Sequence, residues 1–183
     1  MNLWLNPTHF FSQDKEVITN RSIILKNIII LIVGMFFVTC ILYQMIPDVQ
    51  NSNLFLTFAF ITALSVPFYL IFNFFLSLVY LLVLIFFHPS LKISKFYTLI
   101  LTYNTLNFLF SSIGVNLLFY YENNLTRIFI IGISLFINIW SLRILFAGLI
   151  NFIGFSKKVS IVFCSTLFLL NLLLLIGGNF VNV

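Results

Sequence analysis

Five long hydrophobic stretches, separated by short polar segments, constrain the fold of this chain more than any other feature. About 20 apolar residues in a helix cross the roughly 30 Å hydrocarbon core of a bilayer. Only 7% of the residues are charged, against about 25% in soluble domains. We therefore expect an all-α, polytopic membrane helix bundle. Its five transmembrane helices are expected at about 22–46, 66–87, 95–119, 125–150 and 159–177 of a membrane domain 22–183, after an N-terminal segment 1–21.

The second hydrophobic stretch, 54–87, is too long for one upright crossing. As a single helix it would measure roughly 50 Å, yet it is too short for two crossings and a turn. Pro67 interrupts it. We therefore expect an interfacial or re-entrant piece at Leu54–Leu64 and a span that begins near Val66. A single helix kinked at Pro67 is the alternative.

The N-terminal segment 1–21 mixes apolar and charged residues, which favours a short helix lying on the membrane surface. Asn6 followed by Pro7 is typical of an N-cap and a first helical residue. In this interpretation Trp4, Phe10 and Phe11 enter the lipid headgroup region. The alternative is that the segment docks onto a partner protein.

The basic residues collect on one side of a five-span chain. Lysine and arginine in short loops mark the cytoplasmic side of a membrane protein. The sequence therefore predicts a cytoplasmic N-terminus and an outside C-terminus. The predicted cytoplasmic side holds Lys15, Arg21, Lys26, Lys92, Lys95, Lys157 and Lys158, whereas the other side holds Arg127 with Asp48 and Glu122.

Polar and small residues recur at steps of three and four along the spans, which places them on one helix face. Such a face is expected to meet other protein rather than acyl chains, either for helix packing or as the lining of a polar path. The faces carry amides and hydroxyls but no carboxylate, which favours packing. The third span carries Tyr97, Ile100, Asn104, Asn107, Ser111 and Gly114; the fourth Ser134, Asn138, Ser141 and Gly148; the fifth Ser160, Cys164, Asn171 and Gly178; the first Asn27, Gly34 and Gln44; the second Asn73, Ser77 and Tyr80.

The residues that catalysis or metal binding needs are sparse. The two histidines, His9 and His88, stand in no cluster with metal-ligand spacing. The chain has no serine elbow or phosphate-binding loop and no soluble basic surface for nucleic acid. Cys40 and Cys164 are predicted in opposite leaflets, too far apart for a disulfide. We expect no enzyme activity, no catalytic residues, no metal, no cofactor and no nucleic-acid partner.

Arg143 is the one charge expected well inside a span. Its side chain can snorkel toward the cytoplasmic interface. Alternatively, it can contact an anion or a phospholipid headgroup together with Lys157 and Lys158. Both interpretations stay open.

Several motifs are similar to those of the Yip family, the Ypt/Rab-interacting five-span membrane proteins, chiefly its bacterial and archaeal branch. The resemblance covers nearly the whole chain and implies a five-helix bundle in a prokaryotic plasma membrane. The long acidic N-terminal region of eukaryotic Golgi members is absent, so Rab binding is not carried over. The motifs are Leu5–Phe11, the loop Leu91–Phe96 leading to Tyr103, Trp140 followed by Arg143 and Gly148, and Phe155–Lys158.

Three functional hypotheses follow from these features. The first is a non-enzymatic protein that acts by interaction, as a scaffold, assembly factor or membrane organiser, with membrane lipids, other membrane proteins or itself as partners. The second is a small permease or channel that uses the asparagine-lined faces. The third is an accessory subunit of a larger membrane complex.

Overall fold

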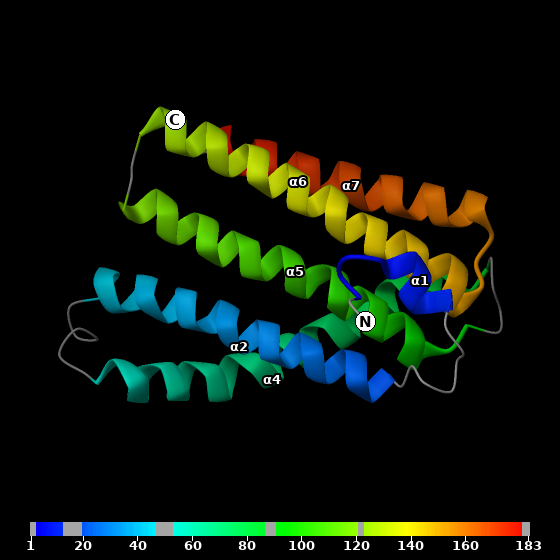
Figure 1. Cartoon of the computed structure of the whole chain (residues 1–183), viewed down its shortest axis with the longest axis horizontal. Helices are drawn as coiled ribbons and strands as arrows, with labels where there is room; N and C mark the ends of the chain where they lie inside the picture. Colours follow the sequence, from blue (N-terminus) through cyan, green and yellow to red (C-terminus); the bar gives the residue numbers. More distant parts are fainter. Residues whose placement is uncertain (1–2, 13–19, 47–52, 87–90, 121–122, 181–183) are drawn as a thin grey trace.

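The computed structural model describes residues 3–12, 20–46, 53–86, 91–120 and 123–180, with side chains as far as Leu117 in the third long helix and Leu173 in the last. All the regular structure in these ranges is helical, which confirms the all-α prediction. The helices of Figure 1 are α1 (Pro7–Ser12), α2 (Asn20–Met45), α4 (Leu54–Leu84), α5 (Ile93–Tyr120), α6 (Asn124–Gly148), the π-helix η1 (Leu149–Ile153) and α7 (Lys157–Phe180).

The long helices alternate in direction and form one bundle, with α5 at its centre (Figure 1). α5 packs against α2, α4 and α6, and α7 packs against α6. Because neighbours surround α5, Phe96 and every residue from Thr98 to Tyr103 are buried. The third span is therefore the core element of the bundle.

Among the described residues, four helical stretches are long and apolar enough to cross a membrane. This marks the chain as an integral membrane protein. The fifth expected span, 159–177, falls on α7, whose last residues lie beyond the side chains that are described. The four stretches are Asn20–Met45, Leu54–Leu84, Ile93–Leu117 and Asn124–Ile153.

The second hydrophobic stretch forms one helix, so the separate piece expected at Leu54–Leu64 is wrong. α4 is 31 residues long and continues through Pro67, which gives a length of about 46 Å. In Figure 1 it begins beside α2, changes direction along its length and passes behind α5. An oblique path accommodates the extra length, and prolines are tolerated inside membrane helices.

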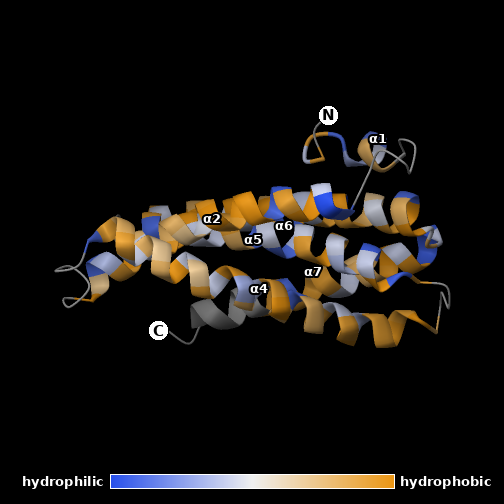
Figure 2. Cartoon of the chain, turned by 90° about the horizontal axis from the view of Figure 1, so that it is seen from below, coloured by the Kyte–Doolittle hydropathy of each residue, from blue (hydrophilic) through white to orange (hydrophobic). Residues whose placement is uncertain are grey.

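The described basic residues that were expected on one side do lie at one end of the bundle. α2, α5 and α7 begin at this end and α6 finishes there, whereas Arg127 lies near the opposite end (Figure 1). Figure 2 shows that hydrophobic residues dominate the length of the helices between the two ends. Lys15, Asp48, His88 and Glu122 lie outside the described residues. The end with the basic residues holds Arg21, Lys26, Lys92, Lys95, Lys157 and Lys158.

α1 begins as expected but is covered by protein. The Asn6 side chain accepts a hydrogen bond from the His9 backbone N–H at 3.2 Å, which confirms the predicted cap. Phe10 and Phe11 are buried against the chain itself instead of entering the headgroups. Their docking surface is α6 and η1, and Figure 2 shows α1 on the outside of the bundle near one end.

The π-helix η1 forms the junction between α6 and α7. Gly154 ends it with a φ of 95°, a left-handed conformation that favours glycine, and its N–H donates to the Leu149 carbonyl at 3.0 Å. The Lys95 ammonium donates to the Phe152 carbonyl at 3.3 Å and lies 4.7 Å from the centroid of the Phe152 ring. Lys95 therefore links the start of α5 to η1.

Candidate functional site

The polar face predicted on α5 meets α4 at two levels. Asn104 Nδ2 donates to Asn73 Oδ1 of α4 at 2.6 Å. One and a half to two turns nearer the start of α5, the Tyr97 hydroxyl donates to the Leu70 carbonyl of α4 at 3.3 Å. Asn73 is buried, and its own Nδ2 donates to the Tyr69 carbonyl at 2.9 Å. The amide nitrogen of Asn104 and the amide oxygen of Asn73 therefore join the two helices.

The same face of α5 meets α6 further along. Asn107 Nδ2 donates to the fully buried Ser141 hydroxyl of α6 at 3.1 Å and to the Tyr103 carbonyl at 3.1 Å. Gly114 is also buried against α6, because a Cβ there would lie 3.2 Å from Ile130 Cγ2. Small residues and amides allow close helix approach in membranes. The face is divided between two neighbouring helices.

Ser111 does not belong to this contact face. Its side chain is exposed, and the neighbouring Ser112 is buried and donates to the Leu109 carbonyl at 2.7 Å. At the level of Ser111, no described helix covers that side of α5. The expectation that Ser111 faces protein is therefore wrong for the single chain.

α5 carries a second polar face, which the sequence reasoning missed. Thr102 accepts a hydrogen bond from Asn27 Nδ2 of α2 at 2.8 Å, and both residues are fully buried. Asn116 Nδ2 donates to the Phe37 carbonyl of α2 at 2.9 Å. At 100° per residue these positions lie roughly opposite Asn104, so α5 has two polar faces. The same three-and-four spacing marks the second face: Thr98, Thr102, Thr105, Ser112 and Asn116.

The polar residues predicted on α6 and α7 lie partly in contact with α5. Asn171 of α7 donates to the Tyr103 hydroxyl of α5. The Asn138 carbonyl accepts from the Ser141 hydroxyl at 2.9 Å, within α6. Ser134 is half-buried. Gly178 lies beyond the described side chains of α7.

The three basic residues proposed to contact lipid headgroups are exposed at one end of the bundle. Arg143 lies on α6 with its guanidinium carbon 5.9 Å from the centroid of the Trp140 ring. Lys157 and Lys158 form the first residues of α7, after the loop that follows η1. Their charges are positioned to meet an anionic surface.

Several of the described polar residues join neighbouring helices. Cys40 and Cys164 are free thiols, each half-buried. In the described part of the chain, no three or more His, Cys, Asp or Glu side chains lie close enough together to hold a metal ion. Most amides and hydroxyls described around α5 donate to carbonyls or to one another, whereas Thr105 Oγ1, Asn27 Oδ1 and Asn138 Oδ1 are buried without a hydrogen-bond partner. Comparisons with protein-family models, with curated proteins and with solved structures find no match for this chain.

Proposed function

We propose that this chain is a non-enzymatic, five-span integral membrane protein that acts by interaction with lipids or other membrane proteins, as a scaffold, assembly or membrane-organising factor. The single observation that carries the proposal is the use of the α5 amides: Asn104, Asn107 and Asn116 donate to α4, α6 and α2. Groups bonded between helices stabilise a bundle. The outer faces of the helices and the end of the bundle with the basic residues are then the surfaces available to bind partners.

The alternative of a small permease requires the asparagines to line a polar path. The side chains of Asn104, Asn107 and Asn116 instead donate hydrogen bonds to neighbouring helices, which favours packing over a permease. An accessory subunit of a larger complex is a special case of the interaction proposal. The resemblance to the Yip family, carried by motifs such as Leu5–Phe11 and Phe155–Lys158, supports a five-helix bundle in a prokaryotic plasma membrane.

The proposed topology has a cytoplasmic N-terminus and an outside C-terminus, with α7 as the fifth span. The distribution of Lys and Arg between the two ends supports it. Single cysteines, introduced in a Cys40→Ser, Cys164→Ser background, test it at four exposed positions. An impermeant thiol reagent added outside intact cells is expected to label Asn53→Cys and Asn123→Cys but to label Lys92→Cys and Lys157→Cys only after permeabilisation. Labelling of Lys157→Cys and Lys92→Cys from different sides contradicts the model.

The interaction proposal is tested by amine cross-linking of native membranes through the exposed lysines Lys92, Lys157 and Lys158, followed by mild detergent extraction. We expect particles heavier than the 21.2 kDa chain, measured by light scattering and identified by mass spectrometry. A Lys92→Gln, Lys157→Gln, Lys158→Gln variant is the control for cross-linking chemistry. Two results together would support a permease instead. Cross-linking would yield only single chains, and the protein in liposomes would show a solute flux that Asn104→Leu abolishes.

A further inference from the structure

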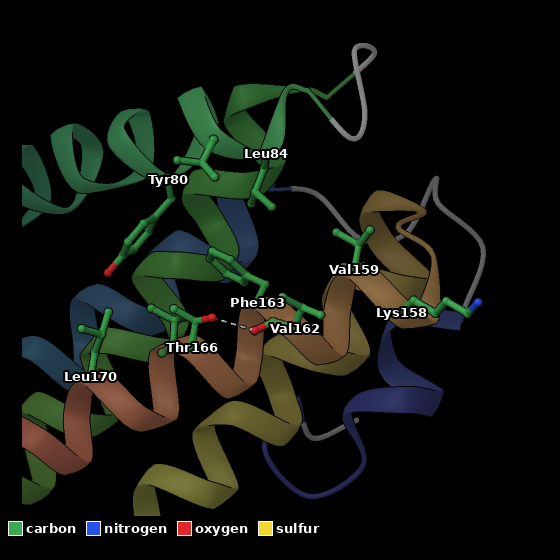
Figure 3. Close-up of a pocket in the computed structure, with 10 residues that line it drawn as sticks. Tyr80, Leu84, Lys158, Val159, Val162, Phe163, Thr166 and Leu170 are labelled. Carbon is green, nitrogen blue, oxygen red and sulfur yellow. Dashed lines mark hydrogen bonds between the residues drawn. The ribbon is translucent and has the colours of Figure 1, made fainter.

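An apolar groove of about 340 Å³ lies between α4 and α7, toward the end of the bundle that carries the basic residues. Tyr80 and Leu84 line it from α4, and Val162 and Leu170 line it from α7 (Figure 3). The ring centroids of Tyr80 from α4 and Phe163 from α7, which both line the groove, lie 5.6 Å apart. Val162 is 66% exposed, so the groove opens outward.

The length of the groove matches one leaflet of a bilayer. Its lining on α7 extends from Lys158 to Leu170, which is about 18 Å along a helix. Half of the hydrocarbon core is about 15 Å thick. An acyl chain that begins at the membrane interface therefore fits along the groove, and an outward-facing apolar surface in a membrane is covered by such chains.

A cation lies where the headgroup of that lipid would be. Figure 3 shows the Lys158 side chain at one end of the groove, extended away from the apolar lining. Lysines at the cytoplasmic interface attract anionic lipids. We propose that the groove binds an anionic glycerophospholipid of the cytoplasmic leaflet, with an acyl chain against α4 and α7 and its phosphate beside Lys158. This inference rests on the membrane placement and lipid interaction proposed above.

A helix of another protein is a poorer fit to the same groove. Close packing of membrane helices relies on Gly, Ala, Ser and other small residues at the contact. The lining consists mainly of branched and aromatic side chains, and Thr166, its smallest polar residue, donates its hydroxyl to the Val162 carbonyl at 3.0 Å. A flexible acyl chain adapts to such a surface more readily than a helix does.

The charge part of the proposal is tested with the purified full chain in detergent. Native mass spectrometry measures the affinity for dioleoylphosphatidylglycerol and for dioleoylphosphatidylcholine. We expect tighter binding of the phosphatidylglycerol, and Lys158→Gln should weaken it about fivefold without changing phosphatidylcholine binding. Lys157→Gln is the matched control, because Lys157 is also exposed but does not line the groove, and it should change the affinity less than about twofold.

The groove itself is tested by filling it. Val162→Trp should lower the affinity for both lipids at least about tenfold, because the indole occupies the acyl-chain path. Ile161→Trp is the matched control: Ile161 is 47% exposed on the same helix but outside the groove. Melting temperatures in detergent check that both variants are folded.

Three outcomes overturn the inference. If Lys157→Gln and Lys158→Gln weaken phosphatidylglycerol binding equally, the lipid is attracted by the general surface charge. If sn-glycerol 3-phosphate competes for the site as well as the lipid does, the site binds phosphate without using a groove for the acyl chain. A Val162→Trp variant that keeps its lipid but loses its cross-linked partner shows a helix-docking site. The first two results are measured on the purified chain and do not depend on whether native complexes form, so the interaction proposal stands or falls separately.

Discussion

Replacing Phe11 by alanine is expected to release α1 from the bundle. The Phe11 side chain is only 3% exposed, and its ring lies 5.5 Å from that of Phe152 in η1. Removing a buried phenylalanine typically costs about 3–5 kcal/mol. A six-residue helix has no stability of its own to compensate. The described links that remain are the buried Leu3 and Phe10 side chains and the hydrogen bond from Trp140 Nε1 to the Trp4 carbonyl at 3.0 Å, which contributes only about 0.5–1.5 kcal/mol.

The two tryptophans of the chain both lie at this contact, so intrinsic fluorescence reports it directly. Phe11→Ala should increase quenching of the tryptophan emission by aqueous acrylamide. Leu5→Ala is the control, because Leu5 belongs to the same segment but is 62% exposed, and it should leave quenching unchanged. Identical quenching curves for Phe11→Ala and the wild type would show that Phe11 does not hold α1.

The docking of α1 illustrates what hydropathy leaves open. An apolar pair such as Phe10 and Phe11 predicts a covered face, whether lipid or protein covers it. The cap formed by Asn6 is local, involves residues three apart, and was predictable from the sequence. The Phe11 ring packs on Phe152, more than a hundred residues away, and the Lys26 ammonium of α2 lies 5.4 Å from the centroid of the Phe10 ring. No local pattern contains these contacts.

The second hydrophobic stretch shows a different limit of hydropathy. If the helix stands upright, its length and Pro67 favour two separate pieces, whereas the alternative, one helix that contains Pro67, is the one that the structure shows. α4 instead runs obliquely past α5, from α2 toward α7, and that path takes up its 31 residues. Tilt is set by packing against neighbours. Hydrophobic length alone therefore does not decide between two short elements and one long helix.

The polar residues of α5 were predictable as faces but not as partners. Helical spacing indicated that Asn104 and Asn107 lie on one side, and both donate across to neighbouring helices. The spacing does not indicate which helix accepts each hydrogen bond. It also does not indicate that Ser111 is left exposed. The face with Thr102 and Asn116 follows the same rule of spacing, but most of its members are threonine and serine, which also occur singly in apolar helices.

Replacing Gly148 by valine is expected to destabilise the contact between α6 and α5. Gly148 is buried, and a Cβ built there would lie 2.4 Å and 2.9 Å from the Cδ atoms of Leu99. Leu99 is 1% exposed and surrounded by packed residues. Overpacking of a filled core typically costs about 1–3 kcal/mol, and the second branch of valine adds to the clash. The free energy of unfolding in a denaturing-detergent titration measures the effect.

Gly132→Val is the matched control, because it makes the same chemical change on the same helix where a Cβ meets nothing within 4 Å. It should leave the free energy of unfolding within about 0.5 kcal/mol of the wild type. Adding Leu99→Ala to Gly148→Val provides space for the valine, so this double variant should be more stable than the sum of the single effects predicts. Strict additivity, or equal losses at Gly132 and Gly148, would mean that close approach to Leu99 is not why position 148 requires glycine.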